Sequence, residues 1–155
     1  QIIGGGLSSR LFQEIRESRS LAYSVYSGTS AYVDTGAFIV AAGCSPRRLN
    51  ELGQVLDHEL AQLVDEGVTD QELEVARSGF EGGTILGLED SGSRMSRLGS
   101  LQTIRGTVTS VDEYLAAITA VTAADVARVI RRVLGTPPTR AIVGPVDADS
   151  LAWSA

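Results

Sequence analysis

The stretch LFQEIRESRSLAYSVYS, residues 11–27, changes its pattern midway, and no other feature constrains the fold as much. Its first part places apolar side chains at helical spacing. This predicts an amphipathic helix that begins at Ser8 or Ser9 as the N-cap and ends near residues 18–20. From residue 21 the stretch is rich in tyrosine and valine and lacks a helical stripe, which is typical of strands. The chain must therefore combine helix and sheet and join them within a few residues.

Further strands and turns are expected on both sides of this stretch. Residues 29–33 and 37–42 continue the strand composition around the turn Asp34-Thr35-Gly36, so we expect two or three antiparallel strands. A short strand is expected at residues 140–143, before Gly144-Pro145. Residues 1–3 are expected to be the last turn of a helix that ends at glycines 4–6.

The region between the strands has the pattern of successive amphipathic helices. Their starts are marked by capping residues, because a Ser or Thr hydroxyl can accept from an N–H that the helix leaves unpaired. The expected helices run from Ser45-Pro46 to Gly67, from the capping box Thr69–Glu72 through Phe80, over residues 95–104 after the break EDSGSR, from Ser110 through Ala120, and from Thr122 to Gly135.

This order of elements predicts an α+β fold with an antiparallel or mixed sheet and helices packed on one sheet face. The chain has 155 residues, of which 43% are hydrophobic and 21% charged, so residues 1–155 fit one domain with its own core. Because the chain begins at Gln1 and its single methionine is Met95, we expect the domain to be truncated at its N-terminus.

Charge and composition exclude several classes of partner. The formal charge of −6 arises from 13 basic and 19 acidic residues spread along the chain, so no basic stripe is available for nucleic acid. No apolar run approaches the about 18 residues that a membrane span needs, and we expect no membrane contact. The single cysteine, Cys44, forms no internal disulfide, which favours a reducing compartment, and we expect a cytoplasmic protein.

Residues for independent catalysis are scarce. A zinc site needs three or four converging ligands, and the only histidine, His58, completes neither H-E-x-x-H nor H-x-x-E-H. The same histidine would have to serve any nucleophile, and no G-x-S-x-G turn occurs. We therefore expect His58 on a helix surface and neither a metal nor another cofactor in this chain.

Arg16 and Tyr23 are a different kind of candidate, seven residues apart across the change from helix to strand. An arginine offers a fixed fork of donors and a tyrosine offers a hydroxyl on a rigid ring, and both suit the binding of a carbonyl or a developing oxyanion. An arginine at a helix end and a tyrosine in a strand are nevertheless commonplace. From spacing alone, a structural role is the better interpretation.

The segment GGGLSSRLFQEIRESRSLAYSVYSG resembles the opening of the C-terminal homologous domain of the pitrilysin, insulysin and mitochondrial processing peptidase family, the inverzincin metallopeptidases. The resemblance continues through EGVTDQELEVARSGFEGG, SRMSRLGSLQTIRG, TSVDEYLAAITAVTAADVARVIRRVL and AIVGP, and so covers most of the chain. Its first part is the most specific. It is closest to the short bacterial and processing-peptidase branch.

The resemblance implies one half of a clamshell enzyme, in which the other, N-terminal half supplies zinc through H-x-x-E-H and a downstream glutamate. The family's second half contributes an arginine and a tyrosine seven apart, which match Arg16 and Tyr23 in RESRSLAY. Their implied role is to hold the substrate backbone near the scissile carbonyl and to stabilise the oxyanion. The implied partners are the N-terminal catalytic half and a peptide substrate, and the implied cofactor of the parent is zinc.

One departure from the family pattern, and the existence of catalytically silent family members, leave alternatives open. The family's first strands are missing, so we expect an exposed sheet edge that can pair with another chain, as in a homodimer. The first hypothesis is the substrate-binding half of a zinc metalloendopeptidase that is inactive alone. The second is a non-catalytic scaffold or partner subunit of the processing-peptidase or respiratory-complex core type. The third is a peptide-binding module that acts as a separate subunit.

Overall fold

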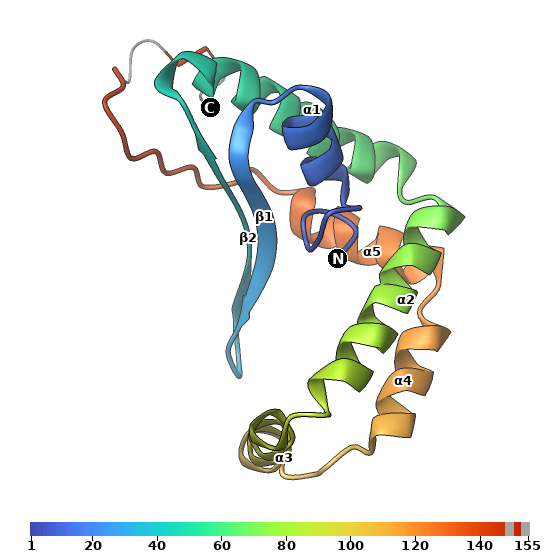
Figure 1. The fold of residues 1–155 in the computed structure, drawn as a ribbon. Coiled ribbons are helices and arrows are strands. Elements are labelled where there is room, and N and C mark those ends of the chain that lie inside the picture. The colour runs from blue at the N-terminus through green and yellow to red at the C-terminus, as the bar shows by residue number, and fades with distance from the viewer. Residues whose placement is uncertain (148–150, 153–155) are drawn as a thin grey trace.

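A β-hairpin and a series of helices make up the computed structural model, which describes residues 1–147 and 151–152 (Figure 1). The predicted α+β class is confirmed. The sheet has two antiparallel strands. The elements in chain order are η1 (Phe12–Ser18), β1 (Ala22–Ala31), β2 (Gly36–Cys44), η2 (Pro46–Arg48), α1 (Leu49–Glu66), α2 (Asp70–Gly87), α3 (Ser91–Arg105), α4 (Val111–Ala120) and α5 (Ala123–Leu134).

The first helix is present but differs from the expected form. Its main part, η1, is a π-helix, a wider coil than an α-helix. Helical residues begin at Arg10, directly after Ser9 as expected, but the Ser9 hydroxyl does not cap the helix, because it donates to the Gly6 carbonyl at 2.6 Å. The N–H groups of Arg10 and Leu11 already donate to the carbonyls of residues 2 and 3, each at 3.0 Å, so they need no capping side chain. Residues 1–5 form a single turn, closed by Gly5 N–H to Gln1 O at 3.1 Å.

The sheet has two strands, the lower of the two numbers expected, and each is longer than the sequence pattern suggested. β1 runs without a break through Gly28, which pairs with Ile39, so residues 21–27 and 29–33 do not form separate strands. The turn lies where it was predicted, and Tyr32 N–H donates to Thr35 O at 2.8 Å across it. Gly36 already belongs to β2 and pairs with Ala31.

The helix starts follow the capping residues closely. Thr69, Ser110 and Thr122 each form a complete capping box at the start of α2, α4 and α5. α2 includes Phe80 as expected and continues to Gly87. α3 begins inside the expected break, because Asp90 accepts from Ser93 N–H at 2.6 Å and caps it.

The short strand expected at residues 140–143 is wrong. This segment has no regular secondary structure and joins no sheet in the part of the chain that the structure describes. Its Arg140 side chain donates to Asp57 of α1 at 2.7 Å. A strand needs a neighbouring backbone, and the described sheet consists of the hairpin alone, so a strand-like composition is not sufficient here.

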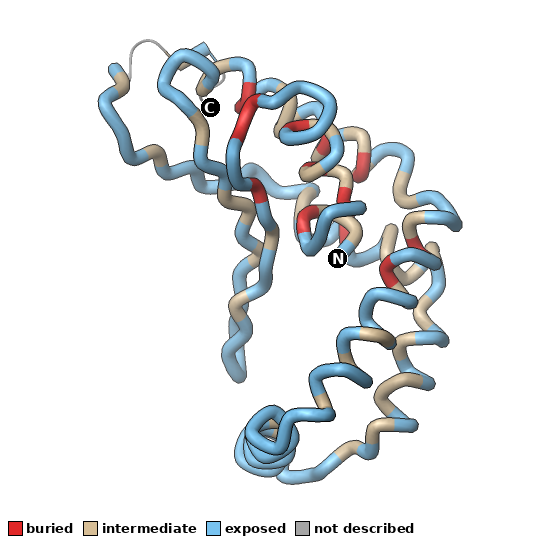
Figure 2. Tube along the Cα trace, in the orientation of Figure 1, coloured by how far each residue is buried: buried red, intermediate tan, exposed pale blue. Residues whose placement is uncertain are grey.

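The core is small and lies where η1, α1 and the start of β1 meet. Figure 2 shows the buried residues concentrated there, while the chain around α3 is exposed. Leu11 and Ile15 are fully buried. The core cluster consists of Leu11, Ile15, Leu21, Ala22, Val25 and Leu52. The hairpin is therefore fixed to the helices at its open end, beside residues 16–23.

An ion pair between Arg10 and Glu72 links this core to the later helices. Arg10 donates to both carboxylate oxygens of Glu72, at 2.5 and 3.0 Å, and to the Gly67 carbonyl at 3.1 Å. The two side chains are 16% and 22% exposed, so water screens the pair only in part. Glu72 also accepts from Thr69 N–H at 2.7 Å in the capping box. One carboxylate thus anchors the start of α2 to the first helix.

Glu72→Gln should lower the free energy of unfolding by about 2 kcal/mol near neutral pH, because it removes a charge-assisted, bidentate contact. The hydrogen bonds from Arg10 and Thr69 lower the pKa of Glu72 from 4.5 to about 2. Its contribution is therefore complete above pH 4.5 and is lost as the pH falls towards about 2. Urea unfolding across this range measures both effects, and the variant should lose this part of the acid dependence.

Glu74→Gln is the matched control on the same helix. Glu74 is 70% exposed and forms only a 3.5 Å pair with Arg77, so its replacement should change stability by less than about 0.5 kcal/mol. Equal losses in the two variants would contradict the special role of Glu72.

Candidate functional site

Arg16 lies in the last turn of η1, and its guanidinium is placed between two aromatic rings. The guanidinium carbon is 4.9 Å from the centroid of the Phe12 ring and 5.5 Å from that of the Tyr23 ring. Both distances are within the range of cation–π attraction. The structure therefore brings together the two residues that the sequence separates by seven positions, and it adds Phe12 to them.

Tyr23 owes its orientation to a β-bulge. Ala22 pairs with Cys44 and Ser24 pairs with Gly43, so Tyr23 is an extra residue with no partner on β2. A bulge bends the strand and re-aims the side chain of the extra residue. The Tyr23 side chain is 85% exposed and free to meet a ligand.

The connection between η1 and β1 is also irregular. Ser20 has a φ of 50°, a left-handed conformation that is uncommon for residues other than glycine. Beside it, Leu21 N–H donates to Ile15 O at 2.8 Å and closes the wide helical turn. A π-helix, a left-handed residue and a β-bulge thus follow one another, and such features concentrate at functional sites.

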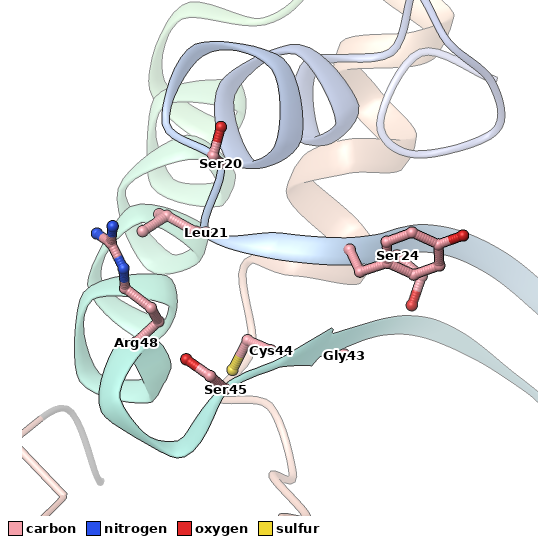
Figure 3. Close-up of a pocket in the computed structure, with 8 residues that line it drawn as sticks. Ser20, Leu21, Ser24, Gly43, Cys44, Ser45 and Arg48 are labelled. Atoms are coloured by element: carbon pink, nitrogen blue, oxygen red, sulfur yellow. The ribbon is translucent and has the colours of Figure 1, made fainter.

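Two shallow hollows adjoin Tyr23. The first has a volume of about 580 Å³ and lies at the open end of the hairpin, between the start of β1 and η2 (Figure 3). Its lining consists of Ser20, Leu21, Tyr23, Ser24, Gly43, Cys44, Ser45 and Arg48. The second is lined by Arg16, Glu17, Ser20, Ala22 and Tyr23. Tyr23 and Ser20 belong to both hollows, so a ligand that contacts Tyr23 can extend into either.

The chemistry of this site is that of hydrogen-bond donors. Arg16 offers several N–H donors in a plane and Tyr23 a hydroxyl, which together can hold a carbonyl oxygen or a developing negative charge. The thiol of Cys44 is half-buried, and burial raises its pKa, which makes it a poor nucleophile. The site can therefore bind and polarise a carbonyl, but it offers no activated nucleophile of its own.

The residues present do not fit a zinc ion. No group of three or more His, Cys, Asp or Glu side chains converges among residues 1–147 and 151–152. His58 lies exposed on α1. Its neighbour Glu59 is buried, and this burial raises the pKa of the Glu59 carboxyl.

Among residues 1–147 and 151–152, no helix is both long and apolar enough to cross a membrane.

Sequence reasoning singled out Arg16 and Tyr23 but missed Phe12, Ser20 and Arg48. Phe12 had a usable signal, because residues four apart meet on one helix face and an aromatic ring there can stack on a guanidinium. Ser20 and Arg48 had no signal in the sequence. The left-handed conformation of Ser20 and the place of Arg48 in the lining of a hollow both depend on how the segments pack.

Comparison with known proteins points to one family. The family described as "Peptidase M16 inactive domain" matches residues 1–80. An uncharacterized zinc protease of Streptomyces coelicolor is 46% identical over 144 residues, which cover 93% of this chain and 31% of that protein. The uncharacterized zinc protease YmxG of Bacillus subtilis is 35% identical over 144 residues, which cover 93% and 35%. The chain thus spans about one third of the length of these relatives.

Solved structures share the fold. A conserved protein from Enterococcus faecalis is 26% identical with a TM-score of 0.72, and the match covers 84% of this chain and 30% of that one. A peptidase M16 inactive domain from Pseudomonas fluorescens has a TM-score of 0.75 at 23% identity, with 85% of this chain and 32% of that chain covered.

Phe12→Leu should release the Arg16 guanidinium from its stacked position, because leucine keeps an apolar side chain but has no ring. The side-chain protons of Arg16 lie near two ring faces, so NMR should find their resonances displaced by ring currents. In the variant these resonances should move towards the values of a solvated arginine. Phe80→Leu, on α2, is the matched control and should leave them unchanged. Identical Arg16 spectra in wild type and Phe12→Leu would show that the stack does not form.

Proposed function

The chain belongs to the peptidase M16 family as its inactive type of domain, and from this premise we propose that it is the substrate-binding C-terminal half of a zinc-dependent metalloendopeptidase. The predicted family is thereby confirmed. The relatives that are named zinc proteases support the proposal, as does their length, which is about three times that of the matched region. The other parts of such a parent would carry the metal and the cleavage chemistry.

The observation that carries the proposal is the stacking of Arg16 on Tyr23 at an irregular and exposed stretch of backbone. In the proposed role, the Arg16 guanidinium and the Tyr23 hydroxyl donate hydrogen bonds to the substrate backbone beside the scissile carbonyl. Donors that are already oriented stabilise a developing oxyanion more than they stabilise the neutral carbonyl, and this difference lowers the barrier.

This division of labour makes the chain inactive alone. The described residues do not fit a zinc site, so no step of hydrolysis is assigned to them. The proposed partners are the N-terminal catalytic half, which would hold the zinc, and an extended peptide bound between the two halves. Arg16 and Tyr23 would act from the second side of that peptide, and they would position it rather than cleave it.

A non-catalytic scaffold or partner subunit is the second candidate. The family description calls this domain inactive, and a domain without a metal site suits either kind of parent. The two candidates differ in the upstream part of the parent protein: a peptidase needs H-x-x-E-H there and should bind zinc, whereas a scaffold needs neither. Zinc analysis of the purified parent decides between them. A separate peptide-binding subunit, the third hypothesis, would bind unfolded peptides as the isolated chain without metal.

In the full-length parent, Arg16→Ala and Tyr23→Phe should each lower kcat for peptide hydrolysis by roughly a hundredfold, the usual cost of removing one oxyanion donor. The effect should appear in kcat more than in KM, because these donors act most strongly in the transition state. Steady-state kinetics with a fluorogenic peptide measures both constants. Tyr26→Phe is the matched control: Tyr26 lies on β1 and is 59% exposed but lines neither hollow.

If both variants retained zinc and their turnover were unchanged, the roles assigned to Arg16 and Tyr23 would be wrong. A loss of activity in Tyr26→Phe equal to that in Tyr23→Phe would instead point to a general effect on the hairpin.

A further inference from the structure

We propose that the hollow at the open end of the hairpin is a specificity subsite for an acidic side chain of the substrate peptide, with Arg48 as its recognition residue. The proposal rests on the proposed function, since it assigns a substrate class to the same site. It adds a second cation, in the hollow that shares Tyr23 with the one lined by Arg16.

The position of the hollow makes it continuous with the carbonyl-binding pair. Tyr23 lines this hollow and also the hollow that contains Arg16. A peptide whose backbone lies against Tyr23 would therefore place a neighbouring side chain in the first hollow. Its volume of about 580 Å³ is ample for one side chain. In Figure 3, the Arg48 side chain rises from η2 beside the Leu21 side chain, at the opposite end of the hollow from Ser24.

The charge of the lining selects the ligand. Arg48 is the single charged residue among those that form this hollow, and the remainder are neutral, with the hydroxyls of Ser20, Ser24 and Ser45. The whole chain carries −6, but no acidic residue lines this hollow, so Arg48 alone sets the sign of its lining. The planar guanidinium matches a carboxylate in two parallel hydrogen bonds, whereas a lysine or arginine of the peptide would be repelled.

Arg48 is available for this contact. Its Nη1 atom donates to Oε2 of Glu51 at 2.8 Å, but the two side chains are 50% and 51% exposed. Exposed ion pairs of this kind are worth about 0–1 kcal/mol, so a substrate carboxylate can replace Glu51 at little cost. Glu51 then acts as a weak competitor that keeps the guanidinium oriented when the hollow is empty.

The test varies the charge at residue 48 of the full-length parent and the charge of one side chain in its peptide substrates. A set of peptides carries Glu, Gln or Lys at each position next to the scissile bond, and both binding affinity and kcat/KM are measured. Wild type should prefer Glu over Lys at one position by about fivefold. Arg48→Gln should abolish this preference and Arg48→Glu should reverse it. Glu51→Gln, which removes the competitor, should increase it.

Arg47→Glu is the matched control, because Arg47 lies in the same short helix, changes the net charge equally and does not line the hollow. It should leave the preference unchanged. The proposal is overturned if wild type shows no Glu preference, if Arg48→Glu leaves it intact, or if Arg47→Glu reverses it equally through the general field. Binding affinities decide the question even in a parent that does not cleave. Failure here leaves the Arg16 and Tyr23 kinetics untouched, so it is distinct from failure of the proposed function.

Discussion

The burial of Leu11 and Ile15 against the start of the hairpin and α1 is the contact on which the remaining structure depends. These two side chains are completely buried, in a core that otherwise consists of few residues. They fix η1 in place, and with it the segment that turns into β1. Arg16 follows Ile15 directly, so its guanidinium reaches the surface immediately beside the best-packed part of the molecule. The side chains of the site are exposed, but its backbone is held in place by the buried side chains of Leu11 and Ile15.

The parts of the fold that could be predicted from the sequence are those decided by local chemistry. Thr69, Ser110 and Thr122 each place a helix start correctly, because a capping box involves only residues three apart. The failed strand at residues 140–143 shows the opposite case. Its composition suits a strand, but a strand also needs a partner backbone, and no local pattern reveals whether one lies beside it.

The candidate site was only half predictable for the same reason. The types and spacing of Arg16 and Tyr23 were visible in the sequence, and the family resemblance gave them a role. Their contact with each other was not, because it depends on the π-helix, on left-handed Ser20 and on the strand bulge. Each of these deviates from the regular form that periodicity assumes. Periodic patterns describe the scaffold well and are least informative where the backbone leaves its regular geometry.

The bulge at Tyr23 also means that the site depends on one extra residue in β1. Ala22 and Ser24 already face consecutive residues of β2, namely Cys44 and Gly43. A chain shorter by this one residue could form an uninterrupted ladder with the same neighbours. The hairpin therefore has no need of its tyrosine. The spacing of seven residues from Arg16 is the regular connection plus one surplus position, and the surplus position carries the exposed ring of Tyr23.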